Sequence, residues 1–304
     1  MIKSVTVTNY LGDSMVLELT NPEPSGFVIT GIEGLGPAKT NINTTDLASN
    51  DGSLYNSARL ENRNIVIDLE FLWHNSIEDT RQLTYKYFPI KKPVTLAIKT
   101  DNREAMTLGY VESNEPTIFS EREGCQISII CPDPYFYSTG EGGTTITVFS
   151  GVQPNFQFPF SNESLLVPLI EMGILENLKE RTIYYTGDAE TGVIIYIHAI
   201  GRADNVTIYN TGTRELFIID TTRLESLTGH GIIAGDDITI STLRGKKRIT
   251  LLRNGVETNI LNCIDKNSSW FQLAKGDNVF TYIAEYGASN LQFKIQSQIV
   301  YEGV

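Results

Sequence analysis

The side chains that most often perform chemistry are sparse in this chain. Its three histidines are His74, His198 and His230, and no two of them have the spacing of metal ligands. His198 falls within an apolar run, where a core or hydrogen-bonded histidine is much commoner than a catalytic one. The sequence contains no nucleophile elbow, P-loop or zinc pattern. We therefore predict that the protein is not an enzyme.

Carboxylates and glycines offer only weak alternatives. Paired carboxylates could serve a glycosidase, but in a chain with 36 acidic residues such pairs are equally well read as solvated turn residues. The candidate pairs are Asp236-Asp237, Asp188/Glu190 and Glu121/Glu123. The glycine-rich stretch 31–36 lacks phosphate-binding spacing and is interpreted as a turn. We expect no cofactor.

The cysteines indicate neither a disulfide framework nor a metal site. Cys125 and Cys131 lie six positions apart on an expected strand, which places them roughly 20 Å apart, beyond disulfide reach. Cys263 is distant in sequence. We interpret all three as small buried hydrophobic residues of a reducing compartment, and we expect no bound metal.

The composition describes an ordinary folded protein with an acidic surface. The chain has 304 residues, 41% of them hydrophobic, enough for about two domains of ~150 residues. No apolar run approaches the ~20 residues of a membrane span, and residues 1–8 do not resemble a secretory signal. The net charge of −12 disfavours specific nucleic-acid binding. It suits a surface past which nucleic acid slides without adhering.

The first part of the chain is predicted to be strand-rich with one helix. Ser76 is a candidate N-cap, the residues after it have helical periodicity, and Pro89 ends the pattern. A polar segment from about Gly34 to Asn64 is too long for an idle loop. It is either mobile or an arm ordered by something outside the chain. The expected strands are 2–8, 15–19, 27–32, 65–72, 94–98, 106–111, 116–119 and 124–131.

The second part is predicted to be nearly pure β. The stretch Cys131–Tyr137, with two prolines followed by aromatic residues, ends the last strand of the first part. We place the domains at 1–137 and 138–304. Asn254-Gly255 between two β runs is a strong hairpin signal, and Asn210–Thr213 is a second one. Short, regularly spaced strands favour a β-sandwich of the jelly-roll type.

Exposed aromatic residues leave open a sugar-binding function. Trp270 and Tyr286 are candidates for stacking on a saccharide. Trp270 is followed by Phe271 on an expected strand, so one of the two should belong to the core. A carbohydrate-binding, lectin-like module is therefore the alternative function.

The order of several short motifs resembles the distal tail protein (Dit) family of long-tailed, siphovirus-type bacteriophages. The likeness covers both halves of the chain, and residues 152–190 fit it least. In the first half it includes Gly26–Ile29, Asp51-Gly52, Arg59, Arg63, Arg81, Gly109–Val111 and Cys131–Phe136. In the second half it includes Gly245–Lys247, Asn254-Gly255, Trp270–Leu273, Lys275–Asn278 and Tyr301–Val304.

The resemblance implies a structural protein of the virion, made in the host bacterial cytoplasm and placed at the distal end of the tail. The fold expected is mainly β, with an N-terminal ring-forming domain carrying one helix and a C-terminal galectin-like sandwich. The implied assembly is a homo-hexameric ring that lets DNA pass. Its implied partners are the major tail tube protein, the tail-associated tip protein, and receptor-binding proteins or host saccharides.

The resemblance also suggests where the interfaces lie. Arg59 and Arg63, with Asp51 and Gly52, are expected at the contact between subunits, because arginine suits bidentate pairing with carboxylates across an interface. The run from Asp133 through Pro134 and Tyr135 to Phe136 is expected at the seam between the two domains.

Overall fold

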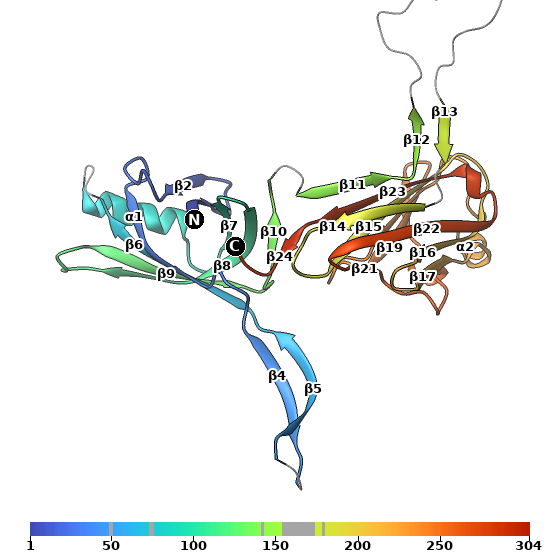
Figure 1. Cartoon of the computed structure of the whole chain (residues 1–304). Helices are drawn as coiled ribbons and strands as arrows, with labels where there is room; N and C mark the ends of the chain where they lie inside the picture. Colours follow the sequence, from blue (N-terminus) through green and yellow to red (C-terminus); the bar gives the residue numbers. More distant parts are fainter. Residues whose placement is uncertain (49–50, 73–75, 141–142, 154–173, 178–179) are drawn as a thin grey trace, which may run out of the picture. The chain divides into compact units, whose positions relative to one another are not determined.

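The computed structural model describes residues 1–48, 51–72, 76–140, 143–153, 174–177 and 180–304. The chain forms two compact units (Figure 1). Unit 1 comprises Met1–Gly143 together with Val300–Val304, and unit 2 comprises Thr144–Ile299. The chain therefore leaves unit 1 at Gly143 and returns to it at Val300.

Unit 1 is built on one large antiparallel sheet whose strands run in the order β2-β1-β7-β8-β9-β6-β3. Alternate residues such as Ile65 and Ile67 on β6, and Ile127 and Ile129 on β9, are buried in its core, as the period of two in a half-buried strand requires. The strands are β1 (Ile2–Thr8), β2 (Ser14–Glu18), β3 (Phe27–Glu33), β6 (Arg63–Phe71), β7 (Pro93–Thr100), β8 (Glu104–Thr117) and β9 (Gly124–Cys131).

Two short strands complete this sheet. β10 (Phe136–Ser138) pairs antiparallel with both β8 and β24 (Val300–Tyr301). In the second of these pairs Phe136 lies opposite Tyr301 and Tyr137 opposite Val300. Strand β10, before unit 2, thus lies beside strand β24, after unit 2.

The predicted helix is confirmed as α1 (Ile77–Tyr87). The Ser76 hydroxyl accepts a hydrogen bond from the backbone N–H of Glu78, at 3.1 Å, which satisfies one of the free donors of the first turn. The helix ends at Phe88, whose N–H donates to the carbonyl of Thr84, immediately before Pro89.

The polar segment expected between Gly34 and Asn64 forms a β-hairpin, which we call the arm. It consists of β4 (Thr40–Asp46) and β5 (Ser53–Leu60), which pair only with each other among the described strands. Every residue of both strands is exposed except the half-buried Leu60. Figure 1 shows the arm as a ribbon of two strands.

The turn into the arm depends on Gly34. Its φ is +82°, and a Cβ built there would lie 1.9 Å from the Asn64 carbonyl oxygen. We predict that Gly34→Ala destabilises unit 1 by about 2–4 kcal/mol, measured by urea unfolding. Gly36→Ala is the control, because a Cβ there meets nothing within 4 Å. Equal stabilities of the two variants would contradict this account.

Unit 2 has two antiparallel sheets around a shared core, so the mainly β fold with a sandwich is confirmed. One sheet contains β11 (Thr144–Val148), β23 (Leu291–Gln298), β15 (Thr191–Ala199), β18 (Asp237–Ser241), β19 (Arg248–Arg253), β20 (Val256–Asn259) and β21 (Gln272–Leu273). The other contains β14 (Glu180–Tyr185), β22 (Gly276–Tyr286), β16 (Asp204–Asn210) and β17 (Glu215–Ile219). A separate pair is β12 (Ser150–Gln153) with β13 (Ile174–Asn177).

The two hairpins predicted in unit 2 are confirmed. Asn254 and Gly255 join β19 to β20 with φ values of 52° and 78°, the positive pair that a type I′ turn requires. Asn210 begins the turn between β16 and β17, where its side-chain oxygen accepts from the N–H of Gly212.

A second helix, α2 (Thr221–Thr228), was not predicted. Its caps are visible in the sequence: the Asp220 side chain accepts from two N–H groups of the first turn, and Gly229 closes the helix with a φ of 83°. The second part is nearly pure β, as expected, and α2 was missed because its eight residues are too few to show helical periodicity. Short 3₁₀ turns lie at Leu261–Cys263 and Ala288–Asn290.

Candidate functional site: the arm and its base

The arm has one apolar and one polar face. On β4, Ile42 lies opposite Ala58 and Thr44 lies opposite Tyr55, and directly opposed residues in an antiparallel pair share a face. The side chains of Ile42 and Tyr55 are 60% and 62% exposed. Two large apolar groups are thus presented to solvent on one side of a thin ribbon.

The opposite face of the arm is mostly polar and includes the predicted interface residue Arg59. Asn41 lies opposite Arg59, and Asn43 lies opposite Ser57. Leu54, 57% exposed, is the apolar exception on this face. The other two predicted residues, Asp51 and Gly52, lie exposed in the turn between the strands. Their place at a contact between subunits remains a prediction.

Arg63 begins β6, directly after the arm, and is only 3% exposed. Its Nη1 donates to the carbonyls of Gly34, at 2.5 Å, and Gly36. Its Nε and Nη2 donate to the carbonyl of Pro134, at 2.9 and 2.7 Å, and Nη2 also donates to that of Glu302, at 2.6 Å. These contacts match the five N–H donors of a guanidinium.

The geometry changes the interpretation of Arg63. The guanidinium lies 4.3 Å from the centroid of the Phe136 ring, and burial lowers the pKa of Arg63. The hydrogen-bond partners are main-chain carbonyls of its own chain, and not carboxylates of another subunit. The side chain joins three segments of unit 1, and its expected place at a contact between subunits remains a prediction.

The residues expected at an interdomain seam are part of unit 1. Phe136 is fully buried in the unit 1 core. The Asp133 carboxylate accepts from the Tyr135 N–H at 3.2 Å and from the Tyr137 hydroxyl at 2.6 Å, while the Pro134 carbonyl receives Arg63. Their predicted role at a seam remains a prediction.

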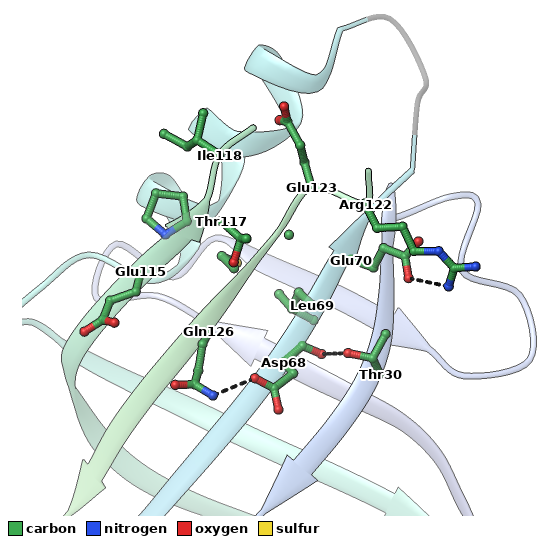
Figure 2. Close-up of a pocket in the computed structure, with 13 residues that line it drawn as sticks. Thr30, Asp68, Leu69, Glu70, Glu115, Thr117, Ile118, Arg122, Glu123 and Gln126 are labelled. Atoms are coloured by element: carbon green, nitrogen blue, oxygen red, sulfur yellow. Dashed lines mark hydrogen bonds and ion pairs between the residues drawn. The ribbon is translucent and has the colours of Figure 1, made fainter. Parts of the chain in front are cut away.

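An acidic groove lies on the sheet of unit 1 (Figure 2). Asp68, Glu70, Glu115 and Glu123 line it, with Arg122 as the basic residue. Asp68 accepts from Gln126 at 2.9 Å, and Glu70 lies 3.8 Å from Arg122. The carboxylates at its centre are thus held in structural contacts, and their charge disfavours binding of phosphates.

The two aromatic candidates for sugar stacking differ. Trp270 packs against the unit 2 core, edge-on to Phe217 at 5.5 Å, and Lys247 lies 5.6 Å from its ring centroid. Tyr286 is 60% exposed, with Arg202 5.9 Å from its ring centroid. Trp270 is thus half-buried against the core whereas Tyr286 offers an exposed ring, and a role of either residue in binding a saccharide remains a prediction.

The candidate catalytic residues are not assembled into a site among the described residues. His198 is hydrogen-bonded, its Nδ1 lying 2.7 Å from Asp237, as the sequence favoured. Asp236 is buried in a bidentate pair with Arg253, at 2.6 and 2.7 Å, so Asp236-Asp237 is not a free acid pair. His230 is exposed on a loop, and His74 lies outside the described residues.

The described part of the chain offers neither a metal site nor a helical membrane span. No group of three or more His, Cys, Asp or Glu side chains there is placed to hold a metal ion. No helix there is long and apolar enough to cross a bilayer.

The three cysteines are buried and reduced. Burial raises the pKa of Cys125 to about 12 and also raises those of Cys131 and Cys263. At pH 8 these groups remain neutral thiols, and the thiolate is the reactive form. We predict no fast reaction of the native protein with Ellman's reagent, and reaction of three thiols after unfolding in guanidinium. A native thiol that titrates within seconds would contradict this.

The fold of the whole chain is similar to that of a solved phage protein. The structure is similar to that of SPP1 Dit (gp 19.1), described as a paradigm of the hub adsorption apparatus in phages that infect Gram-positive bacteria, with a TM-score of 0.64 and 13% identity over 98% of this chain and 99% of that one. Weaker matches are chains of the phage P2 baseplate in its activated conformation with Ca (TM-score 0.47, 14% identity, 98% and 99% covered) and with Sr (0.44, 13%, 97% and 98%).

Part of the sequence of unit 2 matches a family model. Residues 186–296 match the siphovirus-type tail component, C-terminal domain. A search of curated protein sequences gives no significant match. Residues 186–296 thus match the C-terminal domain of siphovirus-type tail components, and the resemblance to the Dit family inferred from the short motifs is confirmed.

Proposed function

We propose that this protein is a structural, non-enzymatic component of a phage tail tip that assembles through unit 1 into a homo-hexameric ring. The ring joins the tail tube to the host-recognition apparatus and lets DNA pass. The observation that carries the proposal is the exposed, amphipathic arm, because a surface of this kind needs a partner.

The arm is unfavourable to order by itself, because its strands lose conformational entropy and bury little surface. A two-stranded ribbon is marginally stable in water, and ordering its backbone costs about 1–2 kcal/mol per residue. The arm buries almost nothing of its own, so packing of Ile42 and Tyr55 on another molecule would offset that cost. A ring of identical subunits supplies such a surface on each neighbour, through heterologous contacts that close on themselves.

Charge supports the passage of DNA. The chain has a net charge of −12, and the groove of Figure 2 concentrates carboxylates on the unit 1 sheet. If such a face lines the channel, the phosphate backbone meets like charge and does not adhere. This arrangement explains why a protein in contact with DNA would be acidic.

The proposed ring lies between two other proteins at the end of the virion tail. The ring contacts the major tail tube protein on one side and the tail-associated tip protein on the other, at the distal end of the virion tail, after synthesis in the host cytoplasm. Unit 2 is available for receptor-binding proteins or host saccharides. The family of residues 186–296 supports a place in the tail.

The test is the molar mass of the purified chain by size-exclusion chromatography with light scattering over a concentration series. We expect a mass near six times 33.8 kDa, and a central channel in negative-stain images of that fraction. A single-copy mass at every concentration, without rings in the images, would overturn self-assembly into a hexamer.

The lectin-like alternative is tested separately with a glycan array probed with the full chain. A structural role for unit 2 predicts no binding above background. Binding that is lost in Tyr286→Ala and kept in Trp270→Phe would favour the alternative, because Tyr286 is the exposed ring of the two.

A further inference from the structure

Residues Val300–Val304 follow unit 2 in the chain but are held in unit 1, through backbone hydrogen bonds and through the packing of Tyr301 and Val304 against the unit 1 core. Strand β24 pairs with β10. After it, the Glu302 carbonyl accepts from Arg63 at 2.6 Å and the Gly303 carbonyl from Arg103 at 2.8 Å. The Val304 N–H donates to the Leu35 carbonyl at 3.1 Å.

Two features make this site selective for the segment that occupies it. The Arg103 guanidinium lies 4.4 Å from the centroid of the Tyr301 ring, within the range of a cation–π contact. A Cβ added at Gly303 would lie 2.9 Å from the Leu35 carbonyl oxygen, so the backbone at 303 approaches residues 35–36 closely. Tyr301 and Gly303 are therefore fitted to this position, whereas the exposed side chain of Glu302 is not.

The same contacts reach both legs of the arm. Gly34 and Gly36 precede β4, and their carbonyls bind Arg63. Arg63 itself follows β5 by three residues, and it also binds Glu302. A further bond, from the Glu61 N–H to the Lys39 carbonyl at 2.8 Å, closes the base of the arm.

We propose that Val300–Val304 is a clasp that fixes the base of the arm, so that the direction of the arm depends on a segment 239 residues away in sequence. The clasp is a built-in conformational device. Without it, Arg63 loses the Glu302 carbonyl and the Leu35 carbonyl loses the Val304 N–H. The base of the arm then keeps the contacts of Arg63 with residues 34–36, Pro134 and Phe136. The consequence for assembly rests on the proposed docking of the arm, but the effect on the arm's base does not.

The test uses Gly303→Val in the full chain, with Glu302→Ala as the matched control. The valine would collide with residues 35–36, whereas the alanine keeps the Glu302 carbonyl that binds Arg63. Hydrogen exchange with mass spectrometry is read on peptides covering 34–39 and 61–63. We expect exchange at least tenfold faster in Gly303→Val, and within twofold of wild type in Glu302→Ala.

Peptides of unit 2 serve as the internal reference for global unfolding. Should Gly303→Val not fold, Tyr301→Leu removes the contact with Arg103 without a clash and is expected to give a smaller change, about threefold, at the same peptides. Unchanged exchange at 34–39 in both variants, or equal acceleration throughout unit 1, would overturn the clasp.

Light scattering on the same samples separates the two proposals. If the wild type forms a ring, and Gly303→Val both loses the ring and exchanges faster at the base of the arm, the clasp and the ring are both supported. If Gly303→Val exchanges faster at the base of the arm but the wild type never forms a ring, the clasp is supported and the proposed ring is contradicted. If Gly303→Val exchanges faster at the base of the arm but keeps the mass of the ring, the contact of Val300–Val304 with the base is supported. The dependence of ring assembly on that contact is then overturned.

Discussion

Arg63→Ala is expected to lower the free energy of unfolding of unit 1 by about 3–5 kcal/mol. The substitution leaves four main-chain carbonyls, of Gly34, Gly36, Pro134 and Glu302, without their donor. A buried acceptor without a partner costs about 1–3 kcal/mol. Water that enters the vacated space would hydrogen-bond some of the four carbonyls, so the total loss of stability is smaller than four times that value. Urea unfolding followed by hydrogen exchange, read separately for the two units, measures the change.

Arg59→Ala is the matched control, since it removes the same side chain four positions earlier from an exposed strand. Its effect on stability is expected to stay within about 0.5 kcal/mol. Arg63→Lys should fall between the two, because an ammonium has three donors and no planar fork. Equal stability of Arg63→Ala and Arg59→Ala would show that the carbonyl cluster does not stabilise the unit.

The second large effect is expected on assembly and not on stability. Ile42 and Tyr55 are exposed in the single chain, so Ile42→Ser with Tyr55→Ser should leave the unfolding midpoint almost unchanged. Burying each side chain at a contact between copies would contribute about 1.5–3 kcal/mol. We expect the concentration at which rings form to rise at least 100-fold, measured by light scattering.

The polar face of the arm provides the comparison. Asn43→Ser with Ser57→Ala changes an opposed pair on the same two strands and is expected to shift assembly less than tenfold. Should this pair disrupt the ring more than the apolar pair, the assignment of the docking face would be wrong. If neither double variant changes the concentration at which rings form, the arm is not the element through which the copies assemble.

Local signals in the sequence predicted much of the fold. Ser76 and Pro89 bracket α1, and Asn254-Gly255 forms the expected hairpin. Each depends on residues within a few positions of one another, where capping and turn preferences act. The polar stretch after Gly34 is interpreted from the sequence as either mobile or an arm ordered from outside the chain. Its hairpin was not foreseen, because β4 and β5 hold too few apolar residues to show the alternation of a half-buried strand.

The base of the arm could not be predicted in the same way. The ligands of Arg63 are backbone carbonyls, which every residue possesses, so no residue type marks them. Two of them, at Pro134 and Glu302, come close only when the chain has folded over a separation of 71 and 239 residues. An arginine before a strand therefore suggested a charged partner, whereas the folded chain supplies uncharged ones.

The return of the chain to unit 1 also sets an order in time. A ribosome adds about 5–20 residues per second, and roughly 150 residues of unit 2 separate Gly143 from Val300, so about 10–30 s pass between them. During that interval β10 has no β24 beside it and Arg63 lacks the Glu302 carbonyl. A nascent chain thus carries its arm before the arm has a complete base.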